Sequence, residues 1–332
     1  MIISWNTTRA CNLACEHCYR DAGAKDKEEL NTKEALQLLS EIANSGFRIL
    51  ILSGGEPLLR KDIYELIYQT TQLGMRAVLG TNGTLFNEEI VRKLKKAGLA
   101  RVGISLDSTD AQIHNRFRRH KNAWQKTVQA MRICKQEGLD FQVHTTVTQR
   151  NFKEVANITD FVMQLGASAH HIFFLVPTGR GKEISDVFLT NLQIKEVLVA
   201  VLNKQKDIPM ELKPVCAPQF IPLAKQFNLA IRFTRGCLAG ISYCCILPNG
   251  DVHPCPYLPL KVGNVRDQKF SQLWKENQVF LRLRSYAYHG RCGSCKESTS
   301  CGGCRARAWH TFGDYMAEDP ECIFKNSHAV CL

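Results

Sequence analysis

The feature that most constrains the fold is a regular alternation of short apolar runs and longer amphipathic stretches over residues 1–205. This alternation is typical of strand–helix units whose strands lie parallel in one sheet. The predicted strands are 2–7, 48–53, 75–81, 101–107, 140–148 and 170–176, and the predicted helices are 32–45, 61–73, 87–97, 122–137, 151–165 and 190–204. Six such units predict an α/β fold, a partial (β/α)6 barrel of the TIM type.

The chain changes character after the last of these helices. Residues 206–236 contain several prolines and no clear period, which predicts a linker. From residue 237 to 332, ten of the fifteen cysteines lie among glycine-rich turns. We therefore predict a barrel domain over 1–205, a linker over 206–236, and a small cysteine-rich domain over 237–332 that is held together by metal clusters.

Composition bears on the chemistry of these cysteines. Hydrophobic residues make up 45% of the chain and charged residues 22%, as in ordinary globular proteins. The N-terminus shows no secretory signal and no apolar run could cross a bilayer, so we expect a cytoplasmic protein with no membrane partner. Thiols stay reduced in the cytoplasm, and the cysteines are therefore predicted to bind metal rather than to form disulfides.

The formal net charge of +12 would ordinarily favour a polyanionic partner. Anionic iron–sulfur centres would offset part of this charge, and the basic residues are scattered along the chain. We expect no nucleic-acid partner, and a substrate rich in carboxylates fits the remaining positive charge better.

Three cysteines, Cys11, Cys15 and Cys18, follow the first predicted strand in the segment RACNLACEHCYRD (9–21). In a barrel, a loop at this position lies at the carboxyl ends of the strands, where barrel enzymes carry their active sites. Three thiolates can bind three irons of a four-iron cluster and leave the fourth iron open for catalysis. The alternative is a zinc site completed by His17 or a distant residue.

The spacing Cys-x3-Cys-x2-Cys in this loop resembles the signature of the radical S-adenosylmethionine (SAM) superfamily. The resemblance implies a [4Fe-4S] cluster whose open iron is chelated by SAM, and reductive cleavage of SAM to a 5′-deoxyadenosyl radical. The cluster would be held by Cys11, Cys15 and Cys18. An electron donor such as flavodoxin or ferredoxin is expected as a partner.

Further segments resemble the superfamily in the same order along the chain. They are SGGEP (53–57), GTNGT (80–84), GISLDS (103–108), HNRFRR (114–119) and VPTGRG (176–181). By resemblance, the residues that contact SAM are Gly54, Gly55, Glu56, Pro57, Asn82, Ser105, Asp107, Arg118 and Arg180, with Arg118 reaching SAM or the substrate. The alternative for each segment is a purely structural turn, helix cap or solvated helix end. His170 and His171 are candidate proton donors or satisfied strand histidines.

The C-terminal cysteines resemble the SPASM extension, which binds auxiliary iron–sulfur clusters. By resemblance, one cluster uses Cys237, Cys255, Cys304 and one of Cys244 or Cys245, and the other uses Cys292, Cys295, Cys301 and Cys322. Cys304 departs from the family spacing, because it follows Cys301 after two residues instead of three. Two auxiliary clusters are expected, with one cluster or a zinc ribbon as alternatives. Cys134 is expected in the core, and Cys216 and Cys331 have no evident partner.

The opening SWNTTRACNLACEHCYRDAG (4–23) resembles the NirJ-type enzymes of haem d1 biosynthesis and related enzymes of the siroheme-dependent haem pathway. The implied substrate is a siroheme-derived tetrapyrrole such as 12,18-didecarboxysiroheme, whose propionate or acetate side chains would be lost or replaced. Two alternatives stay open. One is a SPASM peptide maturase that forms thioether or carbon–carbon links, and the other is a non-catalytic iron–sulfur or zinc module for electron transfer.

Overall fold

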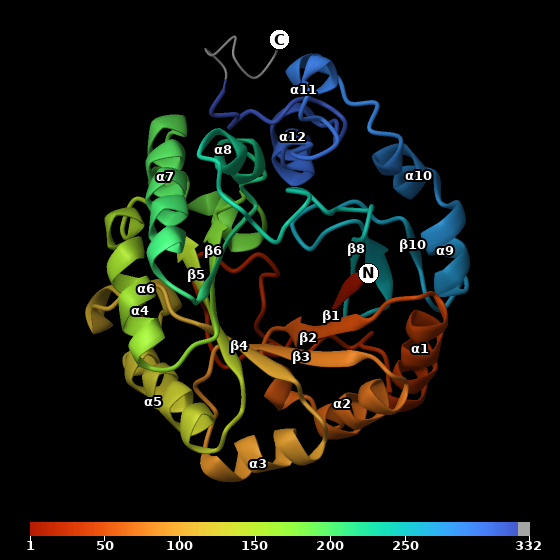
Figure 1. Cartoon of the computed structure of the whole chain (residues 1–332). Coiled ribbons are helices and arrows are strands. Elements are labelled where there is room, and N and C mark those ends of the chain that lie inside the picture. Colours follow the sequence, from red (N-terminus) through yellow and green to blue (C-terminus); the bar gives the residue numbers. More distant parts are fainter. Residues whose placement is uncertain (325–332) are drawn as a thin grey trace.

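The computed structural model describes residues 1–324 and contains one ten-stranded sheet (Figure 1). The strands are β1 (Ile2–Thr8), β2 (Ile49–Gly54), β3 (Arg76–Thr81), β4 (Arg101–Ser105), β5 (Phe141–Val147), β6 (Ala169–Phe174), β7 (Glu211–Val215), β8 (Tyr243–Ile246), β9 (Asp251–His253) and β10 (Gly263–Asn264). Their order in the sheet is β10-β9-β8-β1-β2-β3-β4-β5-β6-β7. The strands from β8 through β7 in this order pair in parallel, and β9 and β10 add an antiparallel edge.

Helices surround the curved sheet on its outer side (Figure 1). The barrel helices are α1 (Thr32–Asn44), α2 (Ile63–Gln72), α3 (Glu88–Lys96), α4 (Ala111–Arg118), α5 (Ala123–Gln136), α6 (Val155–Gln164) and α7 (Asn191–Asp207). The remaining helices are α8 (Phe220–Gln226), α9 (Phe270–Glu276), α10 (Gln278–Arg284), α11 (Gly290–Ser294) and α12 (Arg305–Phe312). No helix among residues 1–324 is long and apolar enough to span a membrane.

Local sequence explains why the first six units form where they were predicted. Asn31 caps α1 by accepting a hydrogen bond from the Glu34 N–H, and the Glu34 side chain returns one to the Asn31 N–H. Gly46 has φ of +83° just beyond this helix, a conformation that glycine adopts without strain. The predicted α/β class and partial barrel are therefore confirmed. Sequence periodicity did not reveal α4, which is only eight residues long.

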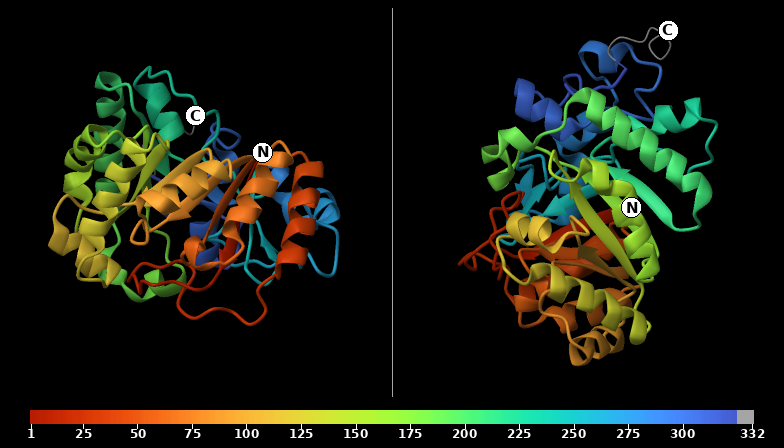
Figure 2. Two further views of the ribbon diagram at one scale, coloured as in Figure 1. Left: turned by 90° about the horizontal axis from the view of Figure 1, so that it is seen from below. Right: turned by 90° about the vertical axis from the view of Figure 1, so that its left-hand side faces the viewer.

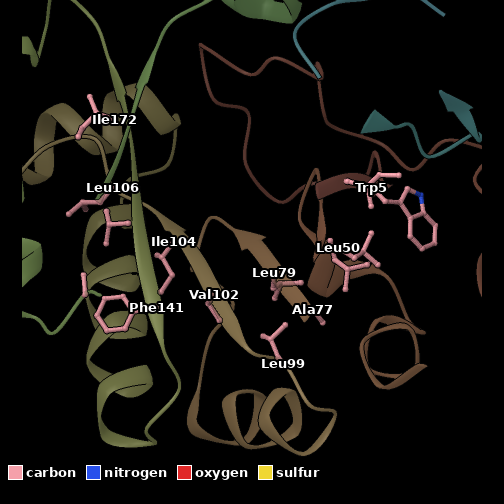
Figure 3. Packing of buried hydrophobic residues seen from close by; sticks show 14 of the residues in the cluster. Trp5, Leu50, Ala77, Leu79, Leu99, Val102, Ile104, Leu106, Phe141 and Ile172 are labelled. Atoms are coloured by element: carbon pink, nitrogen blue, oxygen red, sulfur yellow. The ribbon is translucent and has the colours of Figure 1, made fainter. Parts of the chain in front are cut away.

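The core lies between the outer face of the sheet and the barrel helices (Figure 3). Leu50, Leu79, Val102 and Phe141 project from successive strands toward these helices and are almost completely buried. Complete burial of a side chain of this size contributes about 1.5–3 kcal/mol. The outer face is thus apolar, and the polar residues of the same strands are left for the inner face and the strand ends.

Residues 206–236, expected as a linker, contain β7 and α8 instead. Pro214 lies within β7 opposite Ile172 of β6. A proline cannot donate a hydrogen bond to a neighbouring strand, but β7 is the last strand of the sheet and has a neighbour on one side only. The same proline that made the sequence read as a linker is tolerated because the strand lies at this edge.

The cysteine-rich segment joins the sheet as well. Strand β8 pairs in parallel with β1, with Ile3 opposite Cys244 and Ser4 opposite Cys245. Figure 2 shows from two perpendicular directions that the C-terminal helices lie beside the barrel, and α9 packs against α1. The sheet therefore ends at β7 on one side and at β10 on the other, and its parallel part runs from β7 to β8.

We predict that Leu79→Ala lowers the free energy of unfolding by about 2–5 kcal/mol, because the cavity left in the core cannot close completely. Leu192→Ala is the matched control, because the Leu192 side chain is 75% exposed. Denaturant titration followed by circular dichroism measures both variants. Equal midpoints for the two variants would contradict this account of the core.

Candidate active site

The cysteine loop (residues 9–22) follows β1 at the carboxyl-end edge of the sheet. The Leu13 N–H points at Cys11 Sγ at 3.4 Å, and the Ala22 N–H points at Cys18 Sγ at 3.4 Å. Arg118 Nη1 lies 3.9 Å from Cys15 Sγ. Burial raises the pKa of Cys11 to about 11, so the thiol keeps its proton until a metal replaces it. These donors suit sulfur ligands that carry negative charge.

Arg180 lies in the loop after β6 and binds the cysteine loop, which follows β1. Its Nε donates to the Cys15 carbonyl at 2.9 Å and its Nη1 to the Ala22 carbonyl at 2.9 Å. Nη1 also pairs with Asp21 at 2.7 Å. Arg180 is therefore placed to position the loop that carries the three thiols.

The predicted SGGEP segment lies directly against the cysteine loop. The Gly55 N–H donates to the Thr8 carbonyl and the Glu56 N–H to the Ala10 carbonyl, both at 2.8 Å. A Cβ on Gly54 would lie 2.4 Å from the Thr8 oxygen, and one on Gly55 would lie 2.1 Å from the Ala10 oxygen. Only glycine permits this approach of two backbones.

Glu56 is completely buried at the end of β2. Its carboxylate accepts hydrogen bonds from Thr81 Oγ1 at 2.9 Å, the Asn82 N–H at 3.0 Å and the Leu58 N–H at 3.3 Å. Pro57 begins the short 3-10 turn η1 (Pro57–Leu59) that supplies the last of these donors. Burial raises the pKa of Glu56 to about 7 despite these bonds, so the group is poised to ionise when a cation approaches.

Asn82 connects the β3 end to the cysteine loop. Its Nδ2 donates to Asn12 Oδ1 at 2.9 Å, and its Oδ1 accepts from the Thr84 N–H at 2.8 Å. Thr84 Oγ1 in turn accepts from Asn12 Nδ2 at 2.8 Å. Sequence reasoning missed Asn12 and Thr84, although both lie inside the quoted motifs. Ser105 is the last residue of β4 and is half-buried at the same edge.

Asp107 and Arg118 form a buried ion pair with 2.6 Å between Oδ2 and Nε. The other carboxylate oxygen of Asp107 accepts from the Thr146 N–H at 3.0 Å. Burial by itself would raise the pKa of Asp107, but the charge and hydrogen bond of Arg118, together with His17 and His114, outweigh burial and hold the pKa below its usual range. The pair places the guanidinium beside Cys15, so both predicted residues lie next to the thiols and act on each other.

A second set of thiols, Cys216, Cys237, Cys255 and Cys304, is termed the inner thiol group. Burial raises the pKa of Cys216 well above its usual range, and the neighbouring thiols of Cys304, Cys255 and Cys237 raise it further. Cys255 and Cys304 belong with Cys216 to one small hydrophobic cluster. Sequence reasoning missed Cys216 as a member, because it lies in the supposed linker.

The inner thiol group spans the two edges of the parallel sheet. Cys216 follows β7 directly, whereas Cys237 precedes β8 and Cys255 follows β9. Cys244, one of the two predicted alternatives, packs in the main hydrophobic core. Cys245 faces the other side of β8, where it accepts a hydrogen bond from Asn6 Nδ2 at 3.0 Å. The structure thus brings Cys216 to the inner group and separates Cys244 from it.

The outer thiol group consists of Cys292, Cys295, Cys301 and Cys322, which line one pocket together. The unusual spacing of Cys304 has a structural reason. Gly302 and Gly303 both have positive φ, +71° and +57°, and the turn they form directs Cys301 into the outer group and Cys304 into the inner one. Cys331 lies outside the described residues, and Cys134 is buried in the core as predicted.

The donor sets fit iron–sulfur clusters. The three thiols of the cysteine loop, the inner thiol group and the outer thiol group all consist of sulfur ligands. Such ligands favour iron–sulfur clusters or zinc. Among residues 1–324, no three His, Cys, Asp or Glu side chains converge as a single bound metal ion requires. Convergence on one point is not needed for a cluster, because each thiolate binds a different iron.

The two candidate histidines occupy different environments. His170 is buried between Thr145 Oγ1 at 2.8 Å and Thr159 Oγ1 at 2.9 Å. Burial lowers its pKa to about 3, which fits a structural role. His171 pairs with Glu211 at 3.4 Å and stacks on His144 on the inner side of the barrel.

Comparison with known proteins agrees with this geometry. The radical SAM superfamily profile matches residues 5–162, and the profile of the iron–sulfur cluster-binding domain named SPASM matches residues 237–297. An AdoMet-dependent heme synthase of Methanosarcina barkeri is 39% identical over 98% of this chain and 96% of its own length. This chain belongs to the radical SAM superfamily. It is a radical SAM enzyme that uses SAM and a [4Fe-4S] cluster, and its SPASM domain binds auxiliary iron–sulfur clusters.

A further sequence relative and two solved structures are also similar to this radical SAM enzyme. A pre-heme d1 synthase of Dinoroseobacter shibae is 31% identical over 97% of this chain and 85% of its own length. The crystal structure of Streptococcus suis SuiB with bound S-adenosylmethionine has a TM-score of 0.78 at 17% identity, covering 97% of this chain and 76% of SuiB. Native anSMEcpe with bound AdoMet has a TM-score of 0.75 at 18% identity, covering 98% of this chain and 96% of that chain. The two structures establish the fold.

We predict that Glu56 makes the folded state less stable as the pH rises. A carboxyl whose pKa is raised from 4.5 to about 7 holds its proton more tightly in the folded than in the unfolded chain, so the free energy of unfolding falls between these pH values. Between pH 5.5 and 8, Glu56→Gln should gain about 2 kcal/mol relative to the unaltered chain. Urea titrations at both pH values measure this gain. The exposed Glu65→Gln is the control, and an equal gain for that variant would contradict the prediction.

Proposed function

We propose that this radical SAM enzyme modifies an iron tetrapyrrole of the siroheme-derived haem route by removing or replacing propionate or acetate side chains. The observation that carries the proposal is the similarity to AdoMet-dependent heme synthases from three organisms along nearly the whole chain. A Fe-coproporphyrin III synthase and a pre-heme d1 synthase are also similar over 97% of the chain. Mycofactocin maturases match at lower identity, which favours a tetrapyrrole over a peptide.

The proposed chemistry starts at the cysteine loop. When bound to Cys11, Cys15 and Cys18, the cluster would supply the electron that cleaves SAM. Glu56 would bind the SAM amino group, because its buried carboxylate gains a cationic partner there. We assign the backbone of the Gly54–Pro57 segment, with Asn82 and Ser105 at neighbouring strand ends, to the rest of SAM.

The remaining predicted residues are assigned to positioning. Arg118 would offset the negative charge on Cys15, and Asp107 would hold Arg118 in place through their ion pair. Arg180 would fix the backbone of the cysteine loop. Loss of any of these three should therefore affect the integrity of the cluster before it affects substrate binding.

Loss of a propionate carboxylate also requires an electron acceptor. Conversion of a propionate to a vinyl group releases carbon dioxide, one hydrogen atom to the deoxyadenosyl radical, and one further electron. The inner and outer thiol groups would hold the auxiliary clusters that accept this electron. The inner cluster would use Cys216, Cys237, Cys255 and Cys304, and the outer one would use Cys292, Cys295, Cys301 and Cys322.

We predict that the reconstituted protein converts a propionate-bearing iron tetrapyrrole when incubated anaerobically with SAM and a reductant such as flavodoxin. Fe-coproporphyrin III and 12,18-didecarboxysiroheme are the two substrates to compare. Mass spectrometry should show loss of carboxyl groups with formation of 5′-deoxyadenosine. Cys15→Ala is the control that should form neither product. If both tetrapyrroles stay unchanged while deoxyadenosine accumulates, the substrate assignment is wrong and the radical chemistry stands.

We predict that Cys216→Ala lowers the iron content by up to four atoms from about twelve per chain, because the inner cluster loses a ligand. Cys244→Ala is the matched control, because Cys244 is a buried thiol of β8 that packs in the hydrophobic core. Iron analysis after anaerobic reconstitution measures both variants. The assignment fails if Cys244→Ala loses iron and Cys216→Ala does not.

A further inference from the structure

Arg305 is a completely buried arginine at the start of α12, next to Cys304. Its Nη1 donates to the Tyr315 carbonyl at 3.1 Å and to the Ala317 carbonyl at 2.6 Å. Its Nη2 lies 3.6 Å from Cys292 Sγ, which belongs to the outer thiol group. The guanidinium is thus held by uncharged carbonyl groups and directed at a sulfur atom.

The charge of Arg305 has no carboxylate within salt-bridge distance among residues 1–324. Arg307, two residues later and equally buried, pairs with Asp319 at 3.2 Å and with Glu321 at 2.9 Å. A buried cation without a counterion costs several kcal/mol. The anion available to Arg305 is therefore the outer thiol group itself, in the form of thiolates bound to a cluster.

Gly303 permits the contact between Arg305 and Cys292, and two further groups support it. A Cβ on Gly303 would lie 2.6 Å from Arg305 Nη2 and 3.0 Å from Cys292 Sγ, so a side chain at this position would separate the two. The Asp319 N–H adds a second donor to Cys292 Sγ at 3.4 Å. The ring of Tyr288 lies 4.3 Å from the guanidinium and supports its other face.

We propose that Arg305 raises the reduction potential of the outer auxiliary cluster and so makes it the better electron acceptor of the two. Reduction adds one negative charge to a cluster, and a buried positive charge beside a ligand sulfur stabilises that charge strongly because the surroundings screen it little. At the inner group, the charge of Arg307 is already balanced by Asp319 and Glu321. An electron that leaves the substrate therefore reduces the outer cluster in preference to the inner one. The inference rests on the cluster proposed for the outer thiol group.

The test is a redox titration of the reconstituted protein without substrate, followed by electron paramagnetic resonance. The signal of the outer cluster is the one that disappears in Cys292→Ala. In Arg305→Gln, the ratio of reduced to oxidised outer cluster at a fixed potential should fall at least tenfold, equivalent to about 59 mV for one electron. Arg291→Gln is the matched control, because Arg291 lines the same pocket but is exposed and paired with Glu318 at 2.6 Å. The shift in the reduction potential of the outer cluster should be clearly smaller in Arg291→Gln than in Arg305→Gln.

Arg305→Lys separates charge from packing, since lysine keeps the positive charge. An outer cluster with nearly the original potential in Arg305→Lys supports the proposal, even if Arg305→Gln fails to retain the cluster. A shift in Arg305→Gln no larger than that in Arg291→Gln overturns it, as does an equal shift in Arg305→Lys. If the unaltered chain shows no signal dependent on Cys292, the outer cluster is absent, and both this inference and that cofactor assignment fail. The radical cluster and the substrate assignment would be unaffected.

Discussion

The arrangement of the candidate active site depends on one close backbone contact, which lies between the ends of β1 and β2. Hydrogen bonds from Gly55 to Thr8 and from Glu56 to Ala10 continue the parallel pairing of these strands past the end of the sheet. They join the start of the cysteine loop to the segment that carries the buried Glu56 carboxylate. Because there is no room for a Cβ on either glycine, the distance between the thiols and this carboxylate is set by backbone geometry.

Two buried arginines of this protein lie close to sulfur atoms. Arg118 approaches Cys15 and is oriented by Asp107, whereas Arg305 approaches Cys292 and is held by carbonyl groups. Complete burial makes each charge costly in isolation and effective on its neighbours. The difference between a paired and an unpaired guanidinium therefore provides a physical means to give clusters of the same ligand type different potentials.

The cysteine-rich segment extends the sheet as well as adding ligands. Strand β8 extends the parallel sheet beyond β1, while Cys216 extends from the opposite edge at β7. The inner thiol group collects thiols from both sides of the opening between these edges. A cluster bound there would link the two edges, so metal binding and closure of the barrel are expected to stabilise each other.

The sequence by itself determined the six strand–helix units, the position of the three loop thiols and the family to which they belong. Those features depend on local periodicity, glycine placement and residue spacing, all of which are visible along the chain. Only the tertiary structure decided that β7 and β8 join the sheet, and that Cys216 belongs with Cys304 while Cys244 lies in the core. It also decided that Arg305 lies beside Cys292 Sγ, with no carboxylate within salt-bridge distance among residues 1–324. The physical reason is that edge pairing, the side of a strand that a cysteine faces, and the counterion of a buried charge all depend on residues distant in sequence.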